Sequence, residues 1–321
     1  MDVFFYEAFE EEQEALKHYL PDHIKAGFTW KTIQEYGADA PPAPIISIRT
    51  QSSIPADWAD SLDAILSRST GFDHLKAYMR LTGKELACGH LPLYCHRAVA
   101  EQALLMWLAL QRKFVQQVEQ FKTFHRDGIT GQETEGKTLL VVGVGNIGGQ
   151  VANIGHGMGM KVLCVDLEEK YPNETYVKVE DGISQADIIV CAMDLRQENE
   201  GYFTYDLLKQ AKKGALFINI SRGELSPSPV LLKLIEEGHL GGVALDAYYE
   251  EKALGVALRD GTSSENPGVQ ATLELAKHSN VICTPHNAFN TEEGVERKSE
   301  QSVQQIEQFL KTREFIWPVK L

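Results

Sequence analysis

The sequence is poor in cysteine, in positive charge and in long apolar runs. It has five cysteines among 321 residues, and none of them form a Cys-x-x-Cys pair. Lysine and arginine number 31 against 45 aspartates and glutamates, for a net charge of −14. These features predict reduced thiols in a cytoplasmic protein, and they disfavour duplex nucleic acid or an anionic membrane as partner.

Two further features are missing. The most apolar stretch, residues 102–111, is too short to cross a bilayer. The acidic first residues lack the basic segment of a secretory signal, so no such signal is expected.

Cysteines and histidines gather at Cys88, His90, Cys95 and His96, but their spacing is not that of a zinc site, and we expect no metal there.

A glycine-rich turn between two apolar runs is the most informative motif in the chain. It follows residues 138–142 and consists of Gly143, Gly145, Asn146, Ile147 and Gly148 in a Gly-x-Gly-x-x-Gly pattern, and a second apolar run then ends at Asp166. This order is typical of dinucleotide-binding folds, in which the pyrophosphate lies at a helix N-terminus. Asp166 is expected to accept hydrogen bonds from the adenosine ribose and to repel a 2′-phosphate, which predicts NAD as the cofactor.

The middle of the chain alternates strand-like and helix-like segments. The strand-like runs are residues 138–142, 161–166, 187–192, 215–220, 242–247 and 280–284. This alternation predicts an α/β fold with a doubly wound, mostly parallel sheet.

The first third has a looser pattern, with apolar runs at residues 3–6, 45–48 and 64–66, and predicts a second, smaller α/β domain. We expect a long helix from Arg97 to about Gln120 and a charged amphipathic helix after Phe289 that returns to the first domain. The predicted domains are residues 1–96 with 290–321, for the substrate, and residues 97–289, for NAD.

Polar residues follow several of the strand-like runs. They include Ser221 and Arg222 after one run, Asp246 and Glu251 after the next, and His286 after the last. Carboxyl ends of parallel strands collect ligands, so we expect these side chains to meet. An arginine can hold a carboxylate through two hydrogen bonds, a histidine can transfer a proton near neutral pH, and either Glu251 or Asp246 can stabilise the protonated histidine. Taken singly, Arg222 also fits a surface ion pair and His286 a structural role.

Four segments in this order resemble the D-isomer-specific 2-hydroxyacid dehydrogenase family over nearly the whole chain. They are the glycine turn through Asp166, Phe217-Ile-Asn-Ile-Ser-Arg222-Gly223, Leu245-Asp246-Ala-Tyr-Tyr-Glu-Glu251, and Thr284-Pro-His286-Asn-Ala-Phe289. The resemblance implies a Rossmann NAD-binding domain and a flavodoxin-like substrate domain with the active site in the cleft between them. It also implies a homodimer.

The resemblance further implies roles for individual residues. Arg222, Glu251 and His286 are expected to be catalytic, and Glu251 rather than Glu250 matches the family glutamate. The backbone amides of Thr70 and Gly71 are expected to hold the substrate carboxylate together with Arg222. Cofactor contacts are expected from the glycine turn, Asp166, Ala192, Ser221 and Asp246.

The long segment after Glu251, which we expect to be an extended loop, resembles the fermentative D-lactate dehydrogenase branch. We therefore expect reduction of pyruvate to D-lactate by NADH. A glyoxylate or hydroxypyruvate reductase remains an alternative, and so does an NAD(H)-sensing, corepressor-like binding protein.

Overall fold

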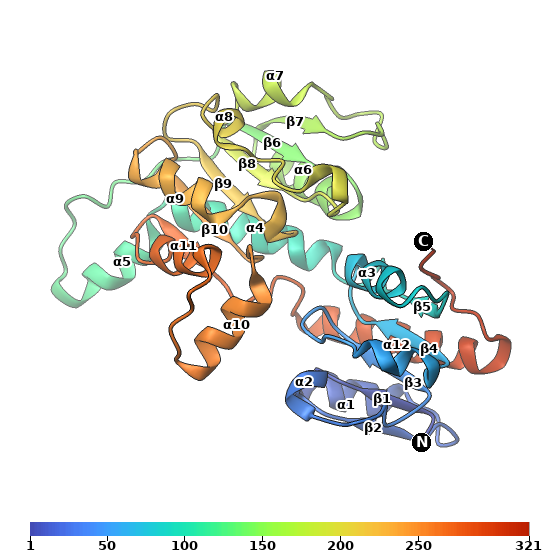
Figure 1. The fold of residues 1–321 in the computed structure, drawn as a ribbon. Coiled ribbons are helices and arrows are strands. Elements are labelled where there is room, and N and C mark those ends of the chain that lie inside the picture. The colour runs from blue at the N-terminus through green and yellow to red at the C-terminus, as the bar shows by residue number, and fades with distance from the viewer. Residues whose placement is uncertain (321) are drawn as a thin grey trace. The chain divides into compact units, whose positions relative to one another are not determined.

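The computed structural model describes residues 1–320, which divide into two compact units. Unit 1 comprises Met1–Cys95 and the segment from Asn290 onward, and unit 2 comprises His96–Phe289. Both units are α/β, as predicted (Figure 1). Among the described residues, no helix is both long and apolar enough to cross a membrane.

Unit 1 is built on a five-stranded parallel sheet in the order β2-β1-β3-β4-β5, which is the flavodoxin-like order. Its strands are nearly continuous apolar runs, because both faces of a parallel sheet are covered. Its elements are β1 (Val3–Phe5), α1 (Glu10–Tyr19), β2 (Ala26–Phe28), α2 (Ile33–Tyr36), β3 (Ile45–Ile48), the 3₁₀ helix η1 (Ala56–Asp60), β4 (Ala64–Ser67), α3 (Asp73–Thr82), β5 (Ala87–Gly89) and α12 (Glu292–Thr312). The sequence did not indicate β2 and β5, which have only three residues each.

The helix α12 belongs to unit 1 and packs against α1. Thr291 caps its N-terminus, because the Thr291 side chain accepts a hydrogen bond from the amide of Gly294. Its last residue is followed by Arg313, which has left-handed backbone angles. Between these ends, buried residues such as Val303, Ile306 and Phe309 face the rest of the unit.

Unit 2 has a six-stranded parallel sheet in the order β11-β10-β9-β8-β6-β7. Its elements are α4 (His96–Gln111), α5 (Phe114–Gln120), η2 (Phe121–Thr123), β6 (Thr138–Val142), α6 (Asn146–Gly157), β7 (Lys161–Val165), α7 (Val179–Ile183), β8 (Ile188–Cys191), η3 (Gln197–Asn199), α8 (Tyr205–Leu208), β9 (Leu216–Asn219), η4 (Gly223–Leu225), α9 (Ser228–Glu236), β10 (Gly242–Leu245), α10 (Glu251–Asp260), α11 (Pro267–Leu275) and β11 (Val281–Cys283). Helices α4 and α6 pack together against the sheet, and α9 packs with α11 (Figure 1).

The strand order becomes that of a dinucleotide-binding fold when one more pairing is counted. Tyr176 forms an isolated parallel bridge to Cys164 in β7, so it stands where a third strand would lie. With Tyr176 included, the order is 3-2-1-4-5-6, followed by the last strand. The strand order reverses direction between β6 and β8, and sheets of this kind bind their ligands at that point.

Two expectations about unit 2 were wrong. The expected single helix is interrupted, because Lys113 adopts a left-handed conformation (φ 50°) between α4 and α5. The segment after Glu251 is mostly helical rather than an extended loop. It forms α10 and α11, and Asn266 caps α11 by accepting hydrogen bonds from the amides of Gly268 and Val269.

Candidate active site

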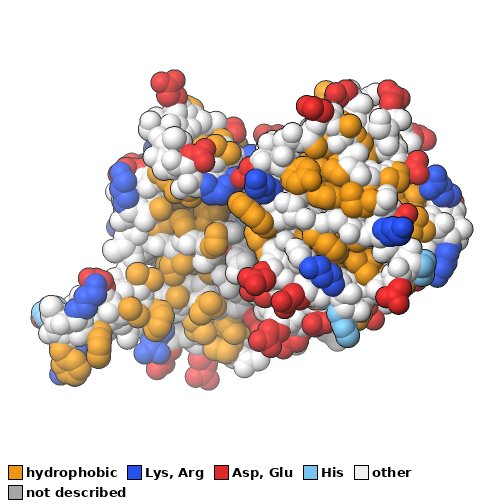
Figure 2. All heavy atoms as spheres, turned by 90° about the horizontal axis from the view of Figure 1, so that it is seen from below, with side chains coloured by type: hydrophobic (Ala, Val, Ile, Leu, Met, Phe, Trp, Pro, Cys, Tyr) orange, Lys and Arg blue, Asp and Glu red, His pale blue; other side chains and the backbone are white. Residues whose placement is uncertain are grey.

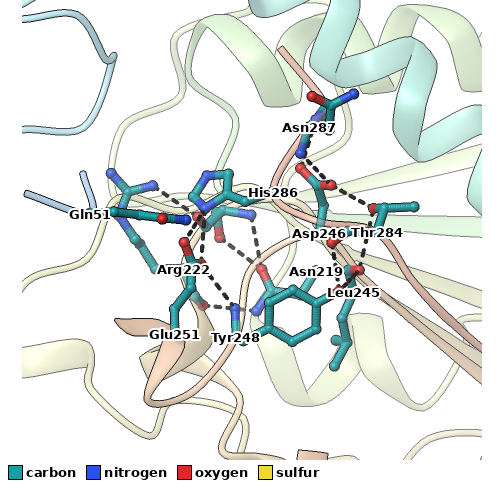
Figure 3. Close-up of polar contacts among 12 residues, drawn as sticks. Gln51, Asn219, Arg222, Leu245, Asp246, Tyr248, Glu251, Thr284, His286 and Asn287 are labelled. Atoms are coloured by element: carbon teal, nitrogen blue, oxygen red, sulfur yellow. Dashed lines mark hydrogen bonds and ion pairs between the residues drawn. The ribbon is translucent and has the colours of Figure 1, made fainter. Parts of the chain in front are cut away.

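Three neighbouring strands of unit 2 end level with one another. Asn219 at the end of β9 pairs with Leu245 at the end of β10, and Leu245 pairs with Cys283 at the end of β11. The polar segments that follow these strands therefore leave the sheet side by side. Figure 3 shows the side chains that they bring together.

The closest polar contact joins a histidine and a glutamate. His286 Nδ1 lies 2.7 Å from Glu251 Oε1 and 2.9 Å from Oε2 (Figure 3). The two side chains are about one fifth exposed, at 22% and 20%. A carboxylate only accepts hydrogen bonds, so His286 Nδ1 carries a proton and Nε2 is the nitrogen left for chemistry. The exposed Glu250 forms no such contact, and it precedes α10 in a left-handed conformation.

The charge of Glu251 is stabilised by its neighbours. Burial raises the pKa of the Glu251 carboxyl. The charge and hydrogen bond of His286 and the charge of Arg222 together outweigh burial, so the pKa is below its ordinary value. The amide of Tyr248 also donates to Oε2, at 3.4 Å. Glu251 therefore remains ionised at neutral pH, when it can stabilise a protonated imidazole.

Asp246 holds the segment around His286 rather than bonding to the imidazole. Its side chain is buried and accepts hydrogen bonds from the Thr284 hydroxyl at 2.5 Å and from the amides of Asn287 and Ala288 at 2.9 and 2.8 Å. Burial raises the pKa of Asp246, against the lowering effects of these hydrogen bonds and of the charge on His286. Asp246 thus joins the end of β10 to the Thr284 side chain before His286 and to the backbone after it (Figure 3).

Asn219 fixes the turn that carries Arg222. Its amide nitrogen donates to the Arg222 carbonyl at 2.8 Å, and its oxygen accepts from the amide of Ser221 at 2.9 Å. The sequence did not single out this residue, which is fully buried at the end of β9 and has its polar atoms hydrogen-bonded. The Arg222 side chain itself donates from Nη1 to the carbonyl of Ser221, at 2.9 Å.

Gly223 allows the turn to pass close to the next segment. A Cβ atom at this position would lie 1.7 Å from the carbonyl carbon of Tyr248. The backbone after Arg222 therefore packs directly on the backbone that leads to Glu251.

The glycine-rich turn fits the pyrophosphate of a dinucleotide. Gly143 has φ +91°, and a Cβ on Gly148 would lie 1.8 Å from the Gly143 carbonyl oxygen, so both positions need glycine. A Cβ on Gly145 would meet no atom within 4 Å, which leaves open space beside the backbone. No side chain caps the N-terminus of α6, because the capping position is occupied by Gly145. The first amides of this helix can therefore bind a phosphate.

The other predicted cofactor residues lie along the same edge of the unit 2 sheet. Asp166 is exposed directly after β7, and its carboxylate accepts hydrogen bonds from the amides of Val144 at 2.5 Å and Leu167 at 2.6 Å. Ala192 follows β8, and Ser221 lies with its hydroxyl 3.1 Å from the thiol of Cys191. Burial raises the pKa of that thiol to about 11, so it is neutral at physiological pH.

The remaining predicted site residues, Thr70 and Gly71, belong to unit 1. They lie in the loop between β4 and α3 and are partly buried. Within residues 1–320, no group of three or more His, Cys, Asp or Glu side chains is arranged to hold a metal ion.

Comparison with known proteins shows which family the chain belongs to. Residues 104–288 match the NAD binding domain of the D-isomer specific 2-hydroxyacid dehydrogenases. The chain is 32% identical to 2-hydroxyacid dehydrogenase A of Aspergillus oryzae, over 80% of this chain and 74% of that protein. It is 28% identical to the glyoxylate reductase of Thermofilum pendens, over 79% and 74%.

A crystal structure gives the same result for the fold. The D-lactate dehydrogenase of Aquifex aeolicus, complexed with NAD and lactic acid, is 25% identical and superimposes with a TM-score of 0.83, over 98% of this chain and 99% of that one. The matched NAD-binding domain and the identity to the Aspergillus protein confirm what the four motifs indicated. The chain belongs to the D-isomer specific 2-hydroxyacid dehydrogenases, which are NAD-dependent oxidoreductases acting on the CH–OH group of small 2-hydroxy acids.

Proposed function

We propose that this dehydrogenase reduces pyruvate to D-lactate, with His286 as the proton donor. The observation that carries the proposal is the 2.7 Å contact between His286 Nδ1 and Glu251, beside the turn that holds Arg222. This arrangement supplies a proton, a fixed negative charge and a guanidinium, which are what reduction of a 2-keto acid needs from the protein. The names of relatives such as the Aquifex enzyme favour lactate as the product.

Each residue has a separate task in the proposed reaction. Bound NADH supplies the hydride. Arg222 binds the substrate carboxylate and polarises the keto group. His286 donates the proton on Nε2 to the carbonyl oxygen, because Nδ1 is held by Glu251. Glu251 stabilises the imidazolium before the transfer, and Asp246 keeps the segment 284–288 in place.

The cofactor roles are proposed on the same basis. The open space at Gly145 and the start of α6 suit the pyrophosphate, and Asp166 suits the adenosine ribose. Ala192 and Ser221 follow strands at the same edge of the sheet and suit the nicotinamide half. In unit 1, the amides of Thr70 and Gly71 are proposed to bind the substrate carboxylate, as the family resemblance implies.

NADH oxidation measured with a panel of 2-keto acids tests the substrate. Pyruvate should give the highest kcat/KM, and chiral analysis should find D-lactate. A preference for glyoxylate or hydroxypyruvate would support the reductase alternative, which the Thermofilum relative also represents. Binding of NADH without turnover of any 2-keto acid would support a sensor protein and contradict the proposal.

We also propose that the protein forms a homodimer through the segment 114–124. Its side chains Phe114, Val115, Val118, Phe121 and Phe124 are each at least half exposed, and Figure 2 shows apolar side chains on this projecting segment. Exposed apolar patches of this kind mark interaction surfaces. Light scattering should give twice the chain mass of 35.8 kDa, and Phe121→Lys with Phe124→Lys should yield monomers. A monomeric wild-type protein would contradict this proposal.

A cytoplasmic location is proposed because the five cysteines are all unpaired. Reduced thiols of this kind are usual in a reducing compartment. Cell fractionation tests the location, and recovery of the protein with secreted or membrane fractions would oppose it.

A further inference from the structure

The loop that carries Thr70 and Gly71 is held by the segment that follows the neighbouring strand, β5. The amide of Leu91 donates to the Ser69 carbonyl at 3.0 Å, and His90 Nδ1 lies 3.0 Å from the Thr70 carbonyl oxygen. The Thr70 hydroxyl donates in return to the Leu91 carbonyl, at 3.3 Å. A carbonyl oxygen only accepts, so His90 Nδ1 is the protonated nitrogen of this pair.

These two carbonyls control the direction of two amides. In a trans peptide the C=O of one residue and the N–H of the next lie in one plane and point in opposite directions, and no described peptide bond is cis. Fixing the Ser69 carbonyl therefore fixes the Thr70 N–H, and fixing the Thr70 carbonyl fixes the Gly71 N–H. Within residues 1–320, neither of these two N–H groups donates a hydrogen bond to another protein atom.

His90 is itself held in place from several sides. Its amide donates to the Trp317 carbonyl at 3.2 Å, and its carbonyl accepts from the buried side chain of Gln305 at 2.7 Å. Its ring packs edge-on against Phe72, with 4.6 Å between the centroids. The imidazole is therefore a fixed donor rather than a mobile surface group.

A second hydrogen-bond chain supports the far side of the loop. His74 Nε2 lies 2.9 Å from the Ser67 hydroxyl, which lies 2.6 Å from the Ser69 hydroxyl, and Ser69 donates to the Gly71 carbonyl at 2.7 Å. The carbonyls of Ser69, Thr70 and Gly71 are thus all occupied, while the amides of Thr70 and Gly71 remain available for a ligand.

We infer that His90 is a positioning residue, which orients the Gly71 amide toward the carboxylate of the 2-keto acid. A preorganised donor binds an anion without the cost of ordering it first. This inference rests on the proposed function, since it assigns the two amides to that substrate. It differs from the proposed catalytic roles because His90 acts through the peptide of Thr70 and Gly71 and exchanges no proton with the substrate.

Two variants separate the hydrogen bond from the packing. His90→Phe keeps an aromatic ring against Phe72 but removes the donor. His90→Asn places an amide nitrogen three bonds from Cα, as Nδ1 is, and restores the donor. His23→Phe makes the same chemical change at an exposed position of unit 1 and serves as the matched control.

Steady-state kinetics provide the first test. His90→Phe should raise the KM for pyruvate roughly 3- to 10-fold, as expected for one lost or misdirected hydrogen bond, with kcat changed by less than about twofold. The NADH dissociation constant should stay the same, His90→Asn should restore most of the KM, and His23→Phe should match the wild type. Equal losses in His90→Phe and His90→Asn, or an unchanged KM in both, would overturn the inference.

An NMR titration separates failure of this inference from failure of the proposed function. Oxamate, an inert analogue of pyruvate, should shift the amide signals of Thr70 and Gly71 in the NADH-bound wild type, and should do so more weakly in His90→Phe. If pyruvate is reduced but these signals do not respond, the inference is wrong and the function stands. If no 2-keto acid is reduced but the signals respond and depend on the donor at position 90, the function is wrong and the inference stands.

Discussion

At the scale of single residues, the contact between Glu251 and His286 has a definite consequence for pH dependence. The pKa of Glu251 is held below its ordinary value, so its negative charge persists through neutral pH, where it favours the imidazolium of His286. In the proposed reaction this imidazolium donates the proton to the substrate.

Glu251→Gln should therefore move the alkaline limb of kcat/KM for pyruvate to lower pH, because the imidazolium loses the negative charge that stabilises it. Glu250→Gln is the matched control, since Glu250 is exposed and lies next in the chain. pH profiles of both variants check the prediction. If the limb moves in Glu250→Gln and stays in place in Glu251→Gln, the prediction is wrong and Glu250 is the partner of His286.

Arg222 is expected to act through its two-pronged geometry as well as its charge. Arg222→Lys keeps the charge but cannot form the paired hydrogen bonds to a carboxylate, so kcat/KM for pyruvate should fall about 10- to 100-fold. The NADH dissociation constant should barely change, because the glycine turn is untouched. Kinetics and NADH fluorescence titration measure the two quantities, and a normal kcat/KM would remove Arg222 from the substrate site.

At the scale of elements, a buried ion cluster joins two helices of unit 1 to its sheet. Glu12 on α1 lies 2.8 Å from Arg68, just after β4, and 3.0 Å from Lys298 on α12, and these side chains are at most 2% exposed. Burial raises the pKa of Glu12, but the charges of Arg68, Lys298 and Arg49 outweigh it and lower the pKa from 4.5 to about 2. Burial and the two arginines lower the pKa of Lys298 to about 8, although Glu12 opposes this.

Glu12→Gln should destabilise the protein by about 3–5 kcal/mol, because it leaves two buried cations without their carboxylate. The folded-state pKa of Glu12 lies below the unfolded value, so its contribution is fully present above about pH 4.5 and is lost as the pH falls toward 2. Urea unfolding at neutral pH measures the loss, with Glu14→Gln on the exposed face of α1 as control. Equal unfolding midpoints for the two variants would contradict the prediction.

The elements also show what the sequence can and cannot reveal. Long apolar runs that end in polar residues predicted β9, β10 and β11, and with them the edge that carries Arg222, Asp246 and His286. The third strand of unit 2 escaped notice because it is reduced to a single bridge at Tyr176. The break at Lys113 also escaped, because lysine is a good helix former and its left-handed conformation depends on the surrounding fold.

The site was predictable in part for similar reasons. The glycine spacing and the acid at position 166 carry their own geometric meaning, so they could be interpreted without coordinates. Asn219 could not be assigned, because its effect depends on a turn that brings its side chain back to the Ser221 amide and the Arg222 carbonyl. The choice between Asp246 and Glu251 as the contact of His286 likewise required the position of α10.

At the scale of the whole molecule, each unit has its own apolar core, and only unit 2 carries the glycine turn. NADH should therefore stabilise unit 2 directly, by about 2.7 kcal/mol when its concentration is a hundred times the dissociation constant. Hydrogen exchange should slow in peptides covering residues 143–166 and remain unchanged in residues 73–82 of α3. If protection were confined to unit 1, NADH would bind there and the prediction would be wrong.

The close approach at Gly223 limits how this enzyme can be redesigned. Any side chain there would collide with the peptide of Tyr248, so the position is closed to all nineteen other amino acids unless the backbone shifts. A shift would move the segments bearing Arg222 and Glu251 against each other. A mutant library aimed at new substrates should therefore leave residue 223 fixed.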